Sequence, residues 1–200
     1  MMTENDPREV AVYRLMPSRR DIRAVLLDES HTQLKRWAFH GPPEERPDHF
    51  GAEWLGERRW PKAEFPSTFP DAPVFGPRLV EAFGAELEAA GTLLPLTITD
   101  GGAAVDEDYR VYVVDEVVDC VDTVASSRPG PLGEMDRTVF RLDALPTHLP
   151  AFRVPEFRMG IYWNGWMVDR LKELLGDALE ARLAWSNVPG RRPHRYVWGV

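Results

Sequence analysis

The chain has 200 residues, of which 44% are hydrophobic and 28% are charged. This length and this balance predict a globular protein with one main domain, and they exclude an intrinsically disordered chain. The formal net charge of -8 argues against a general nucleic-acid surface, because contacts to phosphates need clustered Lys and Arg. An acidic protein of this kind favours a basic partner.

Two features of the sequence favour the cytoplasm. Cys120 is the only cysteine, so neither an internal disulfide nor a multi-cysteine zinc site can form, which is typical of a reducing compartment. Residues 1–8 are polar and acidic, and no uninterrupted apolar stretch approaches the roughly 18 residues that a membrane span needs. We therefore expect a cytoplasmic protein that does not bind a membrane.

The N-terminal third begins with one expected strand, Val10 to Leu15, after which the chain shows no clear periodicity. Prolines are frequent from Gly41 to Pro77, and they remove hydrogen-bond donors and fix φ. We therefore expect neither a long helix nor a central strand there. The aromatic residues of this stretch need cover, which predicts an ordered arm on the surface of the domain.

The middle of the chain has a clearer pattern. An amphipathic helix is predicted to begin at Pro77, with its apolar residues on one stripe. Two strands, Leu93 to Ile98 and Tyr109 to Val114, are expected to follow and to be joined by a turn at residues 101–102.

Shorter elements are predicted towards the C-terminus. Further extended segments are expected at residues 117–121, 138–142, 152–154 and 160–163. A second amphipathic helix contains Met167, Leu171 and Leu175 and is predicted to stop at Gly176. This order of elements predicts an α+β fold: a mixed, mostly antiparallel sheet with two main amphipathic helices and a proline- and aromatic-rich N-terminal arm.

The sequence carries no recognised catalytic signature. It has no P-loop, dinucleotide-binding glycine fingerprint, paired-histidine metalloprotease motif, calcium loop or nucleophile elbow. Nothing local supports a nucleophile pair of Cys120 and His148, and a small buried thiol is the favoured interpretation of Cys120. We therefore expect a protein that is not an enzyme and that holds no metal or cofactor.

The negative charge is concentrated in one part of the chain. Eight carboxylates, opposed only by Arg110, lie within it: Asp100, Asp106, Glu107, Asp108, Asp115, Glu116, Asp119 and Asp122. Such a run can be a solvated strand face that prevents aggregation, or an electrostatic surface for a basic partner. Residues 106–108 are the better candidates for an interface, whereas Asp122 is predicted to form a turn.

Two tryptophans flank a second candidate contact. Trp163 and Trp166 bracket Asn164 and Gly165 just before the last helix, where aromatic residues are more typical of a core than of an interface. The candidate partner-binding residues are therefore Asp106, Glu107, Asp108, Asp115, Glu116, Asp119, Trp163 and Trp166.

From about Phe65 to Trp185 the chain resembles the eleventh family of immunity proteins of bacterial polymorphic toxin systems. The resemblance rests on five segments in order: FPSTFPDAPVFGPRLVEAF, GTLLPLTI, YRVYVVDEVVDCVD, TVFRLDALPTHLPAFRVPE and GIYWNGWMVDRLKELLG. It implies an activity of binding and inhibiting a cognate toxin, with no catalytic residues. It also suggests an N-terminal strand and arm over residues 1–64, an immunity-like domain over 65–188 and a basic aromatic tail over 189–200.

Two functions therefore follow as hypotheses. In the first, the chain is an immunity protein whose acidic surface binds a toxin with a basic surface. In the second, it is a regulatory or metabolic protein that binds a small ligand in an apolar pocket beneath the proline-rich arm, with convergent polar groups and perturbed titrating residues. The sequence leaves the toxin and the oligomeric state open.

Overall fold

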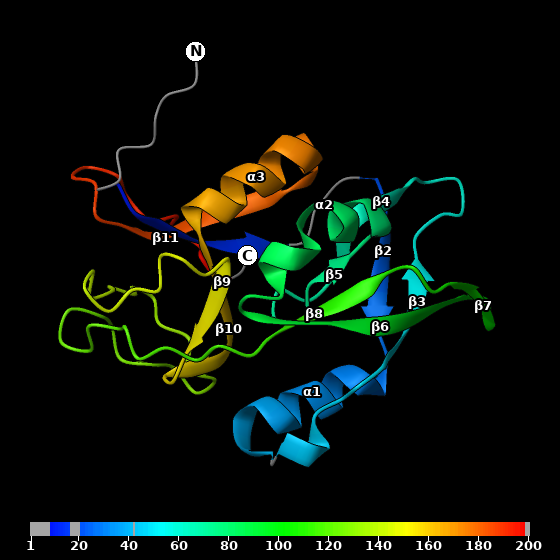
Figure 1. Cartoon of the computed structure of the whole chain (residues 1–200), viewed down its shortest axis with the longest axis horizontal. Coiled ribbons are helices and arrows are strands. Elements are labelled where there is room, and N and C mark those ends of the chain that lie inside the picture. Colours follow the sequence, from blue (N-terminus) through cyan, green and yellow to red (C-terminus); the bar gives the residue numbers. More distant parts are fainter. Residues whose placement is uncertain (1–8, 17–20, 42, 199–200) are drawn as a thin grey trace.

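The computed structural model describes residues 9–16, 21–41 and 43–198 (Figure 1). Helices and strands alternate irregularly along the chain, and the strands form two sheets whose pairings are mostly antiparallel. The predicted α+β class is therefore confirmed.

The smaller sheet brings together the two ends of the described chain. Its strands, in spatial order, are β11 (Glu180–Ser186), β1 (Ala11–Met16), β10 (Phe157–Asn164) and β9 (Ala151–Val154). Neighbouring strands are antiparallel, and every residue of β1 is buried. The strands predicted from Val10 and at residues 152–154 and 160–163 all belong to this sheet, so these predictions are confirmed.

The larger sheet has the order β4-β2-β3-β6-β8-β5, and β7 pairs with the end of β6. Its strands are β2 (Arg23–Leu27), β3 (Phe50–Leu55), β4 (Lys62–Ser67), β5 (Val74–Phe75), β6 (Gly91–Asp100), β7 (Ala103–Asp106) and β8 (Arg110–Val114). The pairs β2–β4 and β3–β6 are parallel. The predicted antiparallel pairing of β6 with β8 is present, but the turn at Gly101 and Gly102 joins β6 to the additional short strand β7. Both glycines have positive φ angles, 65° and 86°, which glycine adopts without strain.

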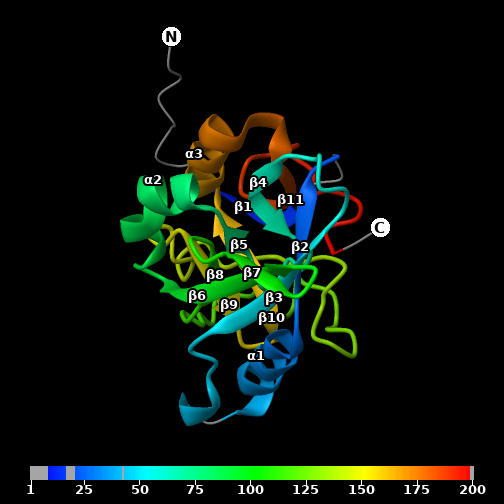
Figure 2. The same cartoon turned by 90° about the vertical axis from the view of Figure 1, so that its right-hand side faces the viewer.

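Helices cover opposite faces of the larger sheet. Helix α1 (Glu29–His40) lies on one side, and α2 (Pro77–Leu87) lies on the other, together with the smaller sheet and α3 (Gly165–Leu175) (Figures 1 and 2). The alternation of β8 explains this arrangement, because Val111 and Val113 belong to the core under α1, whereas Tyr112 and Val114 belong to the core under α2 and α3.

The two predicted helices are confirmed. The apolar stripe of α2 buries Leu79, Phe83 and Leu87, and Pro77 occupies its first turn. Helix α3 ends at Gly176, whose φ of 54° suits a residue without a Cβ. Two short 3-10 helices, Pro43–Glu45 and Gly176–Ala178, follow α1 and α3.

Helix α1 and strand β2 were not predicted. The helix is mostly polar, and it buries Leu34 and Ala38 against the larger sheet, which is a weak periodic signal. Its start is set locally, because the Asp28 side chain accepts a hydrogen bond from the backbone N–H of Ser30 at 2.8 Å.

The prediction that residues 41–77 contain no central strand is wrong. Strand β3 lies between β2 and β6 in the larger sheet and buries Phe50, Ala52 and Trp54. It can do so because the stretch between Pro47 and Pro61 has no proline to interrupt the ladder. The proline-bearing strand β4 pairs only with β2 at the edge of the sheet and continues across the division suggested at residue 64.

The segment between β8 and β9 has few regular pairings. The strand predicted at residues 138–142 is wrong: only a single bridge joins Phe140 to Val121. The predicted turn at Asp122 is confirmed, because its carboxylate accepts hydrogen bonds from the backbone N–H groups of Val124 and Ala125, at 3.0 and 2.9 Å.

Candidate functional site

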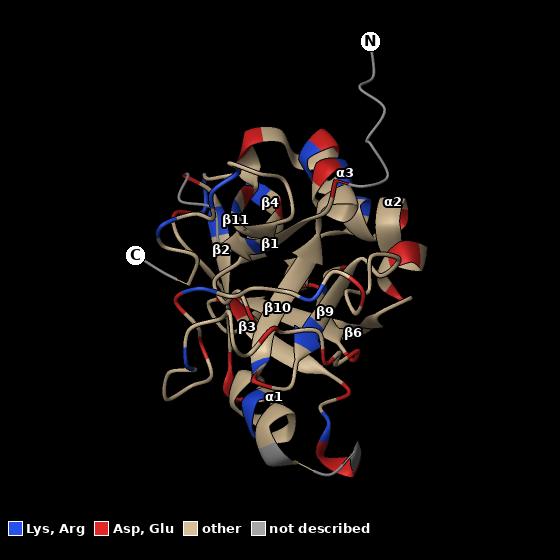
Figure 3. Ribbon diagram, turned by 90° about the vertical axis from the view of Figure 1, so that its left-hand side faces the viewer, with Lys and Arg blue, Asp and Glu red and all other residues tan. Residues whose placement is uncertain are grey.

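The carboxylates of the acidic run do not form one surface. Residues 106–108 precede β8 and residues 115–119 follow it, so the extended strand separates the two groups by on the order of 20 Å. On the side of the molecule that Figure 3 faces, acidic and basic segments are interspersed along several elements. The single acidic face suggested by the sequence is therefore divided.

Several of these carboxylates are neutralised within the chain. Asp106 accepts hydrogen bonds from the indole N–H of Trp54 at 2.6 Å and from Lys62 at 2.7 Å. Asp115 forms an ion pair with Arg46 at 2.9 Å. Their partners come from the proline-rich stretch, so these carboxylates attach that stretch to the rest of the sheet.

Two further acidic residues have cationic partners. Asp100 pairs with Arg23 at 3.0 Å and with Arg58 at 3.3 Å, and these arginines lower the pKa of Asp100. Asp119 pairs with Arg141 at 2.9 Å, although its side chain is 73% exposed. An exposed pair of this kind contributes little to stability and leaves the Asp119 carboxylate accessible.

Three candidates remain exposed without a cationic partner. In the part of the chain that the structure describes, Glu107, Asp108 and Glu116 make no ion pair. Glu107 and Asp108 directly follow β7, which pairs with β6 and with no other described strand. The exposed edge of β7 includes Val105, which is 47% exposed.

The two candidate tryptophans differ. Trp163 is 1% exposed and packs against Phe75 and Tyr112 with ring centroids 6.2 and 5.7 Å away, so its assignment to an interface is wrong. Its side chain points from the smaller sheet into the core shared with the larger sheet, which explains why. Trp166 is only partly buried, and its indole N–H donates to the carbonyl of Thr147 at 3.0 Å.

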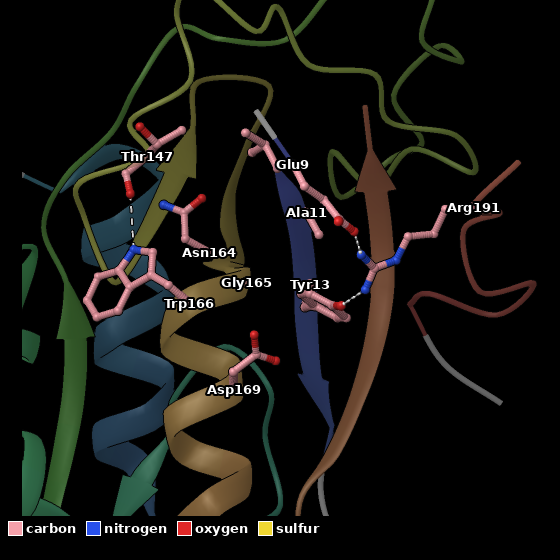
Figure 4. Close-up of a pocket in the computed structure, with 10 residues that line it drawn as sticks. Glu9, Ala11, Tyr13, Thr147, Asn164, Gly165, Trp166, Asp169 and Arg191 are labelled. Carbon is pink, nitrogen blue, oxygen red and sulfur yellow. Dashed lines mark hydrogen bonds and ion pairs between the residues drawn. The ribbon is translucent and has the colours of Figure 1, made fainter. Parts of the chain in front are cut away.

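Trp166 lines a pocket of about 180 Å³ at the N-terminal end of α3 (Figure 4). Glu9 forms an ion pair with Arg191 at 2.7 Å there, and Arg191 also donates to the hydroxyl of Tyr13. Burial raises the pKa of Tyr13, and the nearby Arg191 opposes that shift. A guanidinium of the C-terminal tail thus already occupies part of this pocket.

Asn164 forms the buried wall of the same pocket. Its amide Nδ2 donates to the carbonyls of Pro146 and Leu149 at 2.8 and 2.7 Å, whereas its Oδ1 has no partner. The carboxylate of Asp169 lies across the pocket in Figure 4. Asp169 is therefore the carboxylate that this pocket offers to a hydrogen-bond donor or a cation.

A second, larger cavity of about 410 Å³ lies between β1, β10 and α1, and Pro70 and Asp71 of the proline-rich stretch line it. His31 is buried at its margin and contacts Asp71, with Nε2 3.1 Å from Oδ2. Arg14 lines the same cavity and was not among the predicted site residues. The signal that could have found it is a charged residue inside an otherwise apolar strand.

The thiol of Cys120 is buried, as predicted. Burial raises its pKa to about 12, so the nucleophilic thiolate is scarce at neutral pH. Among the described residues, no three His, Cys, Asp or Glu side chains are grouped so that they could hold a metal ion. The described helices include none that is both long and apolar enough to cross a membrane.

No protein-family model matches the chain, and no curated protein matches it. The resemblance of its five ordered segments to an immunity family therefore stays a prediction.

Proposed function

We propose that the chain is an immunity protein that binds a cognate bacterial toxin and neutralises it as a stoichiometric inhibitor. The order of the five sequence segments supports this function, and the surface around β7 supports the mode of binding. In this proposal the chain is not an enzyme, and its partner is a protein with a basic surface.

One observation carries the proposed contact. Glu107 and Asp108 are exposed, make no ion pair with any described residue, and lie beside the unpaired edge of β7. Unpaired carboxylates attract Lys and Arg of a partner and raise the association rate. An unpaired strand edge also offers backbone N–H and C=O groups to an extended segment of another chain.

The geometry narrows the set of contact residues. Asp106 and Asp115 are excluded as primary contacts because Lys62 and Arg46 already neutralise them. Asp119 and Glu116 lie at the far end of β8 and would belong to a second contact. We therefore place the main contact at Glu107 and Asp108, with the β7 edge as its apolar border.

The test is co-expression with toxins encoded by neighbouring genes. Protection of the cells and the Kd of the purified pair are measured for the natural chain and for a Glu107→Lys/Asp108→Lys variant. We expect the double variant to weaken binding by about tenfold or more, with the larger change in the association rate. Its thermal unfolding should be unchanged, because neither side chain makes an ion pair or a hydrogen bond with the residues that the structure describes.

The matched control is Glu44→Lys/Glu45→Lys, another adjacent and exposed acidic pair. It makes the same change in net charge at a distant short helix and should leave binding intact. Equal losses of affinity in both variants would show a nonspecific charge effect. If neither variant lost affinity, Glu107 and Asp108 would not contact the toxin, and their role would be to keep the β7 edge from aggregating. A chain that protects against none of the adjacent toxins would overturn the function itself.

A further inference from the structure

Arg14 is a charged residue in the interior of the smaller sheet. It lies in the middle of β1, is 4% exposed, and donates from Nη1 to the carbonyl of Ile161 at 3.0 Å. Its Nε has no hydrogen-bond partner, and Arg14 makes no ion pair with any residue that the structure describes. The indole of Trp198 lies over the guanidinium at 4.3 Å.

Other buried arginines show how the chain normally compensates such a charge. Arg23 is also 4% exposed and also stacks on an aromatic ring, but it has Asp100 at 3.0 Å. Arg182 lies directly opposite Arg14 on β11 and has Glu180 at 2.6 Å. Arg14 has no ion pair of this kind with the described residues, and the charge of Asp71 acts on it only from beyond ion-pair distance.

The fourth buried arginine, Arg153, differs from Arg14 in the size of the cavity beside it. Arg153 also lacks an ion pair, but the cavity beside it measures about 10 Å³, so it has room for no more than a water molecule. The cavity that Arg14 lines measures about 410 Å³, within the range of small-molecule sites. Only at Arg14 does an uncompensated buried cation adjoin space for a ligand among these four arginines.

The lining carries two cations, Arg14 and Lys35, and two carboxylates, Asp71 and Glu134. Both carboxylates have hydrogen-bond partners of their own, because Asp71 contacts His31 at 3.1 Å and Glu134 accepts from the backbone N–H of Leu132 at 3.0 Å. Selection for an anion therefore rests on the Arg14 guanidinium, which makes no ion pair with the described residues, and not on the summed charge of the lining.

The walls of the cavity are largely apolar. Phe157, Met159 and Trp198 line it around Arg14, and Leu132, which is 65% exposed, lies at its margin. The Phe157 and Trp198 rings contact each other with centroids 4.8 Å apart. A ligand that fits must combine an apolar body with a single anionic group.

We propose that this cavity binds a small organic monocarboxylate, whose apolar body lies against Phe157 and Met159 and whose carboxylate accepts hydrogen bonds from Arg14. The planar guanidinium matches a carboxylate in geometry and charge, and the apolar side chains around it strengthen that pair. This site is independent of the proposed toxin contact, because it lies between the smaller sheet and α1, whereas that contact lies at β7.

Calorimetric titration of the purified chain tests the site. The probes are benzoate, indole-3-carboxylate and hexanoate, each paired with its neutral amide, and inorganic phosphate as a hydrophilic anion. At least one carboxylate is expected to bind at 1:1 stoichiometry and about tenfold more tightly than its amide. Phosphate is expected to bind more weakly than that carboxylate, because it has no apolar body.

Arg14→Met removes the charge and keeps the volume, and it should weaken carboxylate binding by about tenfold or more. The matched control is Arg23→Met in the larger sheet, which should leave the affinity unchanged because Arg23 does not line the cavity. Asp100 retains its ion pair with Arg58 in this variant. If Arg14→Met does not fold, Met159→Trp fills the cavity and leaves the charge in place, with the same expected loss. Absence of binding by all three carboxylates, equal affinity for acid and amide, or full affinity in a folded Arg14→Met variant would each overturn the proposal.

Discussion

Replacing Asn164 by alanine is predicted to destabilise the fold more than any exposed substitution near it. Asn164 is 2% exposed and lies where β10 passes into α3. Its Nδ2 group holds the loop before β9 through the carbonyls of Pro146 and Leu149. Alanine removes both hydrogen bonds without disturbing the backbone of the strand.

The expected magnitude follows from what each carbonyl retains. The carbonyl of Pro146 also accepts a hydrogen bond from the backbone N–H of Leu149 at 3.0 Å, so it keeps one partner in the variant. Loss of the Asn164 hydrogen bond to this carbonyl therefore costs one net hydrogen bond, about 1 kcal/mol. No second donor to the Leu149 carbonyl is present among the described residues, so that group becomes buried and unsatisfied at a cost of about 1–3 kcal/mol. Alanine also removes the buried Oδ1, which has no partner among the described residues, and this offsets the loss by about 1 kcal/mol. The free energy of unfolding should therefore fall by about 1–3 kcal/mol, and the Tm by roughly 2–12 °C.

The assay is urea unfolding followed by circular dichroism, with the m value compared between variants to verify that the same surface is exposed. Asn187→Ala serves as the reference, because the Asn187 side chain accepts one hydrogen bond, from the backbone N–H of Val10 at 2.8 Å, and is only partly buried. A loss below about 1 kcal/mol in Asn164→Ala would refute the reasoning, because it would show that water replaces the amide at both carbonyls.

Two further predictions concern titrating groups. Because burial raises the pKa of Cys120 to about 12, we expect a thiol reagent at pH 8 to label the native chain far more slowly than the chain in guanidinium chloride, and equal rates would contradict the burial. Burial acts to raise the pKa of Asp71, but the hydrogen bond and charge of His31 outweigh it and lower that pKa below its usual value of 3.8. The ionised Asp71 therefore stabilises the fold above the unfolded-state pKa, and this contribution is lost as pH falls through the lower folded-state pKa. The stability difference between the natural chain and Asp71→Asn should thus shrink as the pH falls from about 5 to about 3, and an unchanged difference over this interval in urea unfolding would contradict the shift.

The elements that could be predicted from the sequence are those with a strong local pattern. Helices α2 and α3 carry apolar stripes and recognisable ends at Pro77 and Gly176. The antiparallel pairing of β6 with β8 follows from apolar runs on either side of a glycine turn, although the short strand β7 between that turn and β8 was not predicted. Asp122 forms its turn with residues two and three positions away, so no distant contact was needed to predict it.

The elements that were missed depend on distant partners. Strand β3 pairs in parallel with β6, and two strands and one helix lie between them in the chain, so nothing in residues 50–55 indicates that neighbour. Helix α1 has a weak apolar stripe and is stabilised by the sheet beneath it. The predicted strand at residues 138–142 failed for the converse reason, because its apolar residues pack as side chains without a neighbouring strand to complete a ladder.

For the candidate sites, the sequence determined the residue types and the tertiary structure decided which of them remain available. The sequence placed eight carboxylates in one stretch, but ion pairing depends on which cations the fold brings close. Lys62 and Arg46, which lie 44 and 69 positions away from their carboxylate partners, remove Asp106 and Asp115 from the accessible set. The same long-range packing leaves Arg14 without a counterion beside a cavity, because charge compensation inside a protein depends on distances in space, which the order of residues along the chain does not specify.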